Sequence, residues 1–223
     1  GLAVAALLTM RSAALTAAPK LLRFMDTIRD YRRIDIGWAL LAIGGDPQEI
    51  ASRTIPLLVD EDTDLCFHAG RLCASASPAE ARRQVSRLIP LLAPEKLAGR
   101  LSALEAVWGL APEAHEAVPA LSRLIDCDQP HVAPMAAKVL GDIGSEAAVA
   151  IPILLGRLAR KPPGHDKAAR SAFCEAIGKM GPSAQSAIPR LLAELREAPL
   201  ASSPGRELDR NDQRVVRTLL FAL

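Results

Sequence analysis

Aromatic residues are scarce in this chain. They make up 3% of its 223 residues, whereas hydrophobic residues make up 50%. A globular core of this size usually contains more aromatic rings, so the scarcity favours thin helical layers packed through alanine and leucine. The net charge is also small, at +2. That balance indicates neither a nucleic-acid-binding protein nor a strongly acidic scaffold.

Sustained alternation of apolar and polar residues is missing as well, and with it the pattern typical of β-strands. No run of about 20 apolar residues is evident, which predicts that this segment does not insert into a membrane. The apolar start, 2–10, fits a helix better than a secretory leader, because no basic residues precede it. No glycine-rich phosphate loop and no serine nucleophile motif occurs. The sequence therefore predicts an all-helical chain that is not an enzyme.

Cysteine and histidine occur four times each, and neither follows the spacing of a metal site. Cys66 and Cys73 are two turns apart on one predicted helix, too far for a disulfide. We therefore expect buried free thiols, a reducing compartment and hence the cytoplasm. No metal and no cofactor is predicted. The four cysteines are Cys66, Cys73, Cys127 and Cys174.

A proline recurs along the chain at intervals of 29 to 37 residues, with an apolar residue before it and a leucine two positions after it. Such a period indicates one supersecondary unit that is repeated and stacked. Because each repeat buries its apolar face against its neighbours, these leucines are predicted to be almost fully buried. The prolines are Pro19, Pro56, Pro90, Pro119, Pro152 and Pro189, and the leucines are Leu21, Leu58, Leu92, Leu121, Leu154 and Leu191.

Each repeat consists of an apolar helix, a break and a second apolar helix. Gly144 and Gly181 lie where the first helix should end, because glycine accepts the left-handed conformation that closes a helix. Pro182 then falls in the first turn of the next helix, where the missing N–H costs no hydrogen bond. The repeated proline lies deeper in the second helix, so it is predicted to bend that helix near its start.

The predicted repeats occupy 1–197 as about six antiparallel helix pairs. The first helices are predicted at 2–10, 34–43, 64–74, 97–109, 131–143 and 166–180. The second helices are predicted at 17–31, 47–59, 78–93, 112–125, 145–159 and 182–197. Residues 198–212 are predicted to form an inter-repeat loop, and 213–223 the first helix of a truncated seventh repeat. Neither end has a polar cap, so we expect the chain to be a fragment.

The stretch Leu140–Gly144 with Ile151–Leu155, and its second copy Ala176–Pro182 with Ile188–Leu192, resembles the HEAT-repeat family. The likeness is greatest to the short bacterial repeats also seen in phycobilisome-lyase-like proteins, and it covers about 1–197. It implies an armadillo-like, right-handed α-solenoid whose second helices line a concave surface. Such scaffolds serve unrelated roles, so the resemblance does not identify a partner.

Basic residues recur on one side of the predicted second helices. With each helix numbered from its proline, the apolar positions fall at roughly 200° to 300° of the helical wheel and the basic ones at roughly 40° to 140°. This basic stripe is predicted to line the concave face and to bind an acidic peptide, an acidic protein surface or a phosphate backbone. The alternative is the ordinary solvent face of amphipathic helices. The stripe comprises Lys20, Arg23, Arg53, Arg87, Arg123, Arg157 and Arg190.

Two further classes of function are open. A nucleic-acid-binding solenoid resembling the alkyl-purine DNA glycosylases would also have a basic concave face, but Trp38 and Trp108 occupy different repeat positions and predict no base-stacking platform. A lyase-like enzyme or chromophore accessory factor would need a nucleophile such as Cys174. The di-iron site of the deoxyhypusine hydroxylases needs several His-Glu pairs, and His115–Glu116 stands alone. We therefore predict a scaffold that mediates protein–protein interaction, with a protein rather than a nucleic acid as partner.

Overall fold

The computed structural model describes Thr9, residues 11–93, residues 97–127, Gln129, residues 131–160 and residues 167–197. In this part of the chain every regular element is an α-helix or a 3-10 helix (labelled η), and none is a β-strand. The predicted all-helical fold is therefore confirmed for these residues. They divide into two compact units: unit 1 extends to Glu116, and unit 2 begins at Ala117.

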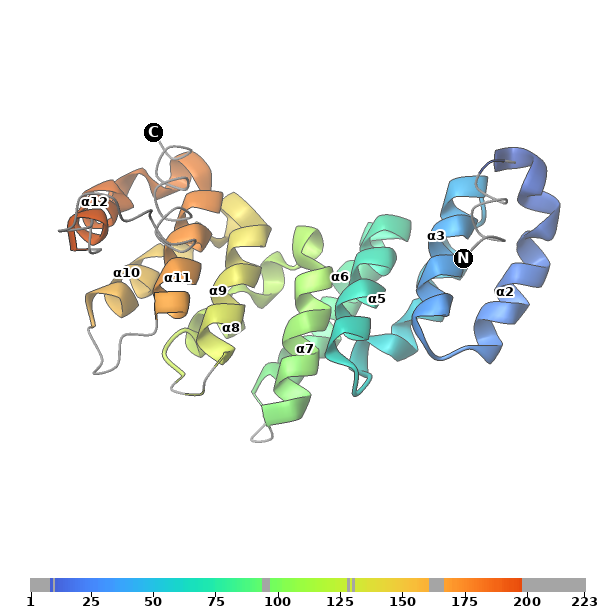
Figure 1. Cartoon of the computed structure of the whole chain (residues 1–223), viewed down its shortest axis with the longest axis horizontal. Helices are drawn as coiled ribbons and strands as arrows, with labels where there is room; N and C mark the ends of the chain where they lie inside the picture. Colours follow the sequence, from blue (N-terminus) through green and yellow to red (C-terminus); the bar gives the residue numbers. More distant parts are fainter. Residues whose placement is uncertain are drawn as a thin grey trace, which may run out of the picture. The chain divides into compact units, whose positions relative to one another are not determined.

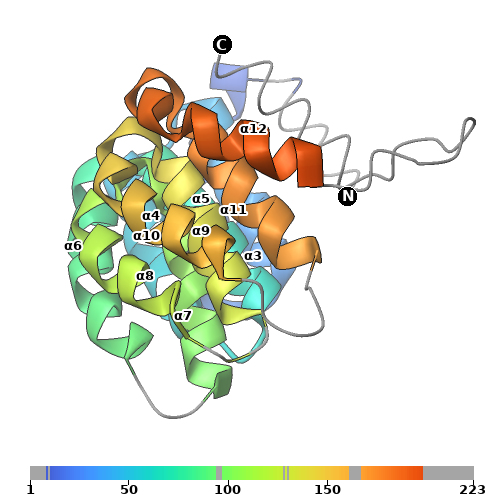
Figure 2. The ribbon, with the colours of Figure 1, turned by 90° about the vertical axis from the view of Figure 1, so that its left-hand side faces the viewer.

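Unit 1 is built from two layers of helices. In the first-helix layer α3, α5 and α7 pack in chain order, with α5 and α7 side by side in Figure 1. In the second-helix layer α2 contacts α4 and α4 contacts α6. Figure 2 shows α4 and α6 on one side of α3 and α5. The segments are η1 (Arg11–Ala17), α2 (Ala18–Thr27), α3 (Tyr31–Ile43), α4 (Pro47–Thr54), η2 (Ile55–Val59), α5 (Thr63–Ala76), α6 (Pro78–Leu88), η3 (Ile89–Leu92), α7 (Leu97–Gly109) and η4 (Ala111–Glu113).

Unit 2 repeats this arrangement. Its first-helix layer is α9 packed on α11, and α8 and α10 lie on one side of that layer (Figure 2). Contacts of η6 with α8 and of η7 with α10 join successive second helices. The short η5 (His115–Ala117) crosses the boundary between the units. The segments of unit 2 are α8 (Val118–Leu124), α9 (Val132–Ile143), η6 (Gly144–Ala150), α10 (Ile151–Ala159), α11 (Lys167–Lys179), η7 (Gly181–Ala187) and α12 (Ile188–Glu197).

Side-chain caps determine where the helices begin. The Asp30 carboxylate accepts a hydrogen bond from the Arg32 N–H at 2.9 Å, and α3 begins at Tyr31 rather than at the predicted residue 34. The Asp46 carboxylate caps α4 in the same way through the Gln48 N–H at 2.9 Å. Each cap satisfies one of the N–H groups that a helix start leaves without a partner.

The ends of two first helices follow the glycine prediction. Gly144 after α9 and Gly181 after α11 have φ angles of 81° and 63°, a region that side chains other than glycine rarely adopt. Most other predicted boundaries lie within a few residues of the observed ones. The prediction for α2 is wrong at its end: the helix stops at Thr27 instead of residue 31, because the chain becomes extended at Ile28. Apart from Thr9, the segments predicted at 2–10, 198–212 and 213–223 lie outside the described residues.

The repeated proline does not lie deep within one second helix, so that placement is wrong. In all six repeats the proline is instead the second residue of a new helical segment, as at Pro19 in α2 and Pro152 in α10. The chain changes there between α-helix and 3-10 helix. Proline has no N–H and its ring obstructs the carbonyl four residues earlier, so it cannot continue the preceding hydrogen-bond ladder. At the start of a new segment that missing N–H costs nothing.

Five of the six predicted core leucines are buried, with at most 2% of their surface exposed. The exception is Leu21, which is only half-buried. The α2 helix instead directs Ala18, Leu22 and Met25 to the core, so its buried face is turned by one residue. The prediction is therefore wrong for Leu21 and confirmed for Leu58, Leu92, Leu121, Leu154 and Leu191.

Neighbouring first helices approach each other at small residues. A Cβ atom added to Gly70 of α5 would lie 2.6 Å from the carbonyl oxygen of Ala106 and 2.9 Å from the Cα atom of Gly109, both on α7. In unit 2 a Cβ atom on Gly141 of α9 would lie 2.8 Å from the Cα atom of Ala176 on α11. The predicted close packing of thin helical layers is thus present in both units.

The segment Val132–Ala159 contains an 18-residue stretch with a mean hydropathy of 1.6 and, by length and composition alone, could span a membrane. Lys138, Asp142 and Glu146 interrupt its apolar residues, so it is not the uninterrupted apolar run whose absence the sequence indicated. In the fold, however, this segment is α9, η6 and α10, with a turn at Gly144, and α9 packs on α8 and α11. Its buried residues, among them Val139, Leu140 and Leu154, belong to the core of unit 2, whereas Val149 is 72% exposed.

Candidate functional site

The basic stripe lies on the second-helix layers, and its members differ in exposure. Four of the seven are exposed and three are half-buried. No ion pair joins any of the exposed four to another described residue. The half-buried members are Arg53, Arg157 and Arg190, and the exposed ones are Lys20, Arg23, Arg87 and Arg123.

Two half-buried arginines hold repeats together. The Nε atom of Arg53 lies 3.2 Å from Oδ1 of Asp26 on α2, an ion pair without aligned hydrogen-bond geometry, and its Nη1 atom donates to the Glu49 carbonyl at 3.1 Å. Arg190 donates from Nη2 to the Leu158 carbonyl near the end of α10 at 3.0 Å. Both guanidinium groups are committed to neighbouring repeats, so they are poorer candidates for partner binding than the exposed cations.

Acidic side chains also enter the second-helix layer of unit 1. Arg82 of α6 pairs with Glu113 of η4, with 2.6 Å between Nε and Oε2, and Ser86 donates to Glu116 at 2.6 Å. Each contact links one repeat to the next. Exposed ion pairs contribute only about 0 to 1 kcal/mol to stability. The main effect of Glu113 and Glu116 is that their negative charge neutralises part of the positive charge beside Arg87.

Arg23 and Arg53 are the two stripe members that the structure brings to a common hollow. A cavity of about 500 Å³ opens between α2 and α4, and both arginines line it. Asp46 and Glu49 line the same cavity, and its apolar wall includes Leu22. The mixed charge makes it a poor site for a simple anion. Arg123, Arg157 and Arg190 belong to unit 2.

A row of rings on the first-helix layer of unit 1 was not foreseen. The Tyr31 ring of α3 meets the His68 ring of α5 edge-on, with 5.7 Å between centroids. His68 in turn contacts Phe67 at 5.3 Å, and Phe67 contacts Trp108 of α7 at 4.4 Å. The repeat pattern does not reveal this row, because Tyr31, Phe67 and Trp108 stand at different distances from the repeated prolines, 25, 23 and 11 residues before them.

The cysteines do not provide an activated nucleophile. Burial raises the pKa of the Cys66, Cys73 and Cys174 thiols to about 11. A reactive cysteine has a lowered pKa and is accessible. Cys174, the candidate nucleophile of a lyase-like enzyme, is instead 2% exposed beside Ala172 and Phe173, which are buried too. It behaves as a core residue.

We expect thiol reagents to modify Cys127 first. It is half-buried, whereas the other three cysteines are buried. Near pH 8, a thiol whose pKa is about 11 is ionised in roughly one molecule in a thousand, so Cys66, Cys73 and Cys174 should react only after unfolding. Mass spectrometry of the folded chain treated with iodoacetamide measures this directly. Fast modification at Cys174 would contradict its placement in the core.

No metal centre forms among the residues that the structure describes, because no three His, Cys, Asp or Glu side chains come together there. His115 and Glu116 are both exposed at η5, and Glu116 accepts the hydrogen bond from Ser86. Among the described residues, no further acid or histidine lies beside this pair to complete a metal site.

No family model matches the chain, and no curated protein matches it. One similar solved structure is the crystal structure of an engineered protein, target OR329 of the Northeast Structural Genomics Consortium. The two are 19% identical with a TM-score of 0.50, over 91% of this chain and 96% of that one. A second engineered protein, target OR497, is 19% identical with a TM-score of 0.49, over 97% of this chain and 63% of that one. At this identity the first likeness shows the fold alone: an all-helical repeat protein of solenoid type.

Proposed function

We propose that this chain is a non-catalytic scaffold of HEAT-like repeats, wound as a right-handed superhelix, that binds another protein through its second-helix layers. The observation that supports this most is the exposure of Arg23, Arg87 and Arg123. These cations lie in the first, third and fourth repeats and have no ion-pair partner among the described residues. Unpaired charge that recurs on the second-helix layers suits the recognition of an extended partner of opposite charge.

The proposed partner is an acidic peptide or protein surface. A nucleic acid would meet the same cations, and Asp26, Glu113 and Glu116 in the same layer of unit 1 act alike on any polyanion, so the choice between the two partners depends on the aromatic residues. Proteins that bind nucleic acid without sequence preference also place aromatic rings within the basic surface. On the second helices of unit 1 the exposed aromatic residue is Phe24.

We expect the triple variant Arg23→Glu, Arg87→Glu, Arg123→Glu to lose binding to an acidic partner. A fluorescein-labelled oligoglutamate peptide is the probe, and its anisotropy is titrated at several salt concentrations. Each exposed pair contributes about 0.3 to 1 kcal/mol, so the three together should change affinity by roughly five- to 100-fold and flatten the salt dependence.

The matched control reverses three cations of the first helices: Arg71→Glu, Arg100→Glu and Lys138→Glu. This variant should bind the peptide nearly as well as the unmodified chain, and circular dichroism verifies that both variants fold. If the two triple variants bind the peptide equally well, the basic stripe is only the solvent-exposed face of amphipathic helices and does not bind the partner. Tighter binding of a labelled oligonucleotide than of the peptide would favour the nucleic-acid class instead.

A further inference from the structure

The first-helix layer of unit 1 concentrates the chain's few aromatic residues on one surface. The chain has one tyrosine and two tryptophans, and all three lie on α3 and α7. Tyr31 is 41% exposed and Trp38 is 37% exposed, although large rings are usually covered in a soluble protein. We call this surface the aromatic face; it comprises Tyr31, Trp38, Phe67, His68 and Trp108.

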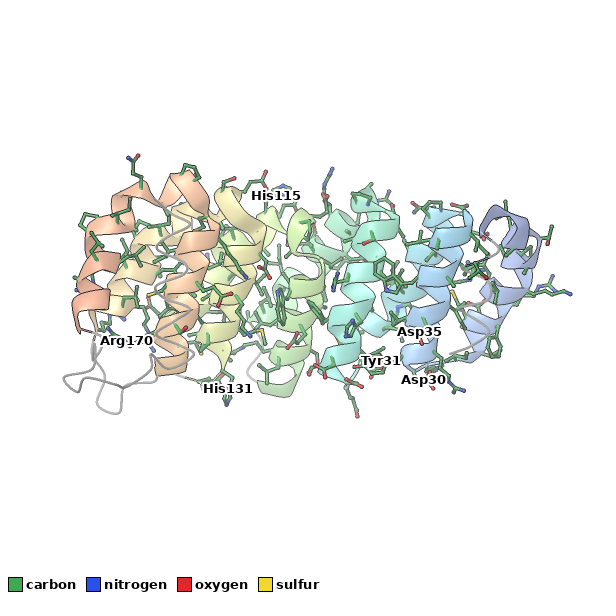
Figure 3. The ribbon with its side chains drawn as sticks, turned by 45° about the horizontal axis from the view of Figure 1, so that its top comes forward. Asp30, Tyr31, Asp35, His115, His131 and Arg170 are labelled. Atoms are coloured by element: carbon green, nitrogen blue, oxygen red, sulfur yellow. The ribbon has the colours of Figure 1, made fainter. Side chains whose placement is uncertain are left out.

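Spacing along α3 places a carboxylate between the two exposed rings. Tyr31, Asp35 and Trp38 lie at positions i, i+4 and i+7, on one side of the helix. Asp35 is exposed, and no ion pair joins it to another described residue. Figure 3 shows Tyr31 and Asp35 close together near the start of α3. The Asp30 carboxylate is neutralised by an ion pair with Arg32, in which Nη2 of Arg32 lies 2.7 Å from Oδ2 of Asp30. Asp30 therefore does not add to the unpaired negative charge of Asp35.

Further negative charge reaches the aromatic face from α5. Asp62 caps α5 by accepting a hydrogen bond from the Leu65 N–H at 3.2 Å, Asp64 lies in the first turn of that helix, and the Tyr31 ring contacts His68 one turn farther along it. Burial raises the pKa of Tyr31, and the carboxylates of Asp62 and Asp64 raise it further. Asp64 is exposed in the first turn of α5 and, like Asp35, has no ion pair within the described part of the chain. Opposing this charge, Arg71 lies over the Phe67 ring at 5.9 Å, farther along α5.

We propose that the aromatic face binds a basic peptide segment, with arginine or lysine side chains stacked on Trp38 and Tyr31 and paired with Asp35 and Asp64. A cation over an aromatic ring is attracted by the negative face of the ring, and tryptophan binds it best. The nearby carboxylates add charge complementarity and repel phosphate, so a nucleic acid does not suit this surface. Arg71 over Phe67 already shows this type of contact within the chain.

This surface differs from the proposed acidic-partner site in location and in charge preference. The basic stripe is on the second-helix layer and the aromatic face on the first-helix layer of unit 1. Either can fail without the other, because one is tested with oligoglutamate and the other with a basic peptide.

The test uses a labelled peptide of alternating arginine and glycine, with a matched peptide in which uncharged citrulline replaces arginine. Fluorescence anisotropy at low salt measures both affinities. A contact between a cation and an exposed ring contributes about 0.5 to 1 kcal/mol, so Trp38→Ala should weaken binding of the arginine peptide by roughly two- to fivefold. Trp38→Phe should retain most of it. Asp35→Asn should weaken it to a similar extent and reduce its salt dependence.

Matched controls come from the other layer of the same unit. Phe24 on α2 is an aromatic residue with 53% exposure, and Glu49 on α4 is an exposed carboxylate. Phe24→Ala and Glu49→Gln should leave binding of the arginine peptide unchanged.

Three results would overturn the proposal. The first is that the citrulline peptide binds as tightly as the arginine peptide. The second is that the control variants weaken binding as much as Trp38→Ala does. The third is that an oligothymidine binds and neither peptide does. Sedimentation experiments test a further outcome. If the chain self-associates with rising concentration, Trp38→Ala abolishes this, and no peptide binds, then the aromatic face binds a second copy of the chain. That result would also overturn the proposal.

Discussion

Gly109→Ala should destabilise unit 1 by about 3 kcal/mol or more, although it adds a single methyl group. A Cβ atom at this position would run into the carbonyl oxygen of Phe67 and lie 2.9 Å from both the Cα atom of Gly70 and the backbone nitrogen of Arg71. All three atoms belong to the backbone of α5, so no side-chain rotation relieves the overlap. The two helices would have to move apart, and the buried contacts of Leu104 and Val107 would loosen with them.

Gly99→Ala is the control on the same helix. A Cβ atom there has nothing within 4 Å, so the change should be neutral or stabilising by up to about 1 kcal/mol through better helix propensity. Urea unfolding followed by circular dichroism compares the two variants with the unmodified chain. If Gly109→Ala and Gly99→Ala unfold alike, α5 and α7 do not pack at the distance described.

The repeat and its helix boundaries could be predicted because they depend on local chemistry. Pro152 removes an N–H wherever it stands, and Gly144 closes α9 because of its own conformational freedom. The same rules did not predict that the repeated proline begins a new helical segment. Whether it bends a helix or starts a new one depends on the residues that satisfy the carbonyls before it, and those belong partly to the 3-10 segments that no periodic pattern revealed.

The aromatic face could not be predicted from the repeat alignment, because it depends on how neighbouring helices are offset. Phe67 and His68 are adjacent in sequence, yet each faces a different neighbour: His68 meets Tyr31 of α3, and Phe67 meets Trp108 of α7. Such a row arises only when the layer is assembled. The basic stripe could be placed on the correct helices from periodicity, but periodicity does not show that Arg53 is engaged with Asp26.

Leu154→Ala should destabilise unit 2 by about 2 to 5 kcal/mol. Leu154 is fully buried, and it lies on α10 between the buried Ile151 and Leu158. Shortening its isobutyl group to a methyl group leaves a cavity in the contact between successive repeats, and the packed neighbours can fill it only in part. In a repeat protein the loss should be greatest in the repeats that share this contact, because stability is carried largely between nearest neighbours.

Ile153→Ala provides the matched control, since it removes a side chain of the same size from the adjacent position. Ile153 is 36% exposed, so its loss should cost less than about 1.5 kcal/mol, the lower end of the range for burying such a side chain. Hydrogen exchange should then show a large loss of protection across α10 and α11 for Leu154→Ala and little change for Ile153→Ala. Equal losses would mean that the proline-to-leucine spacing does not set which face of the second helix is buried. The half-buried Leu21 offers an intermediate case, and Leu21→Ala should fall between the two.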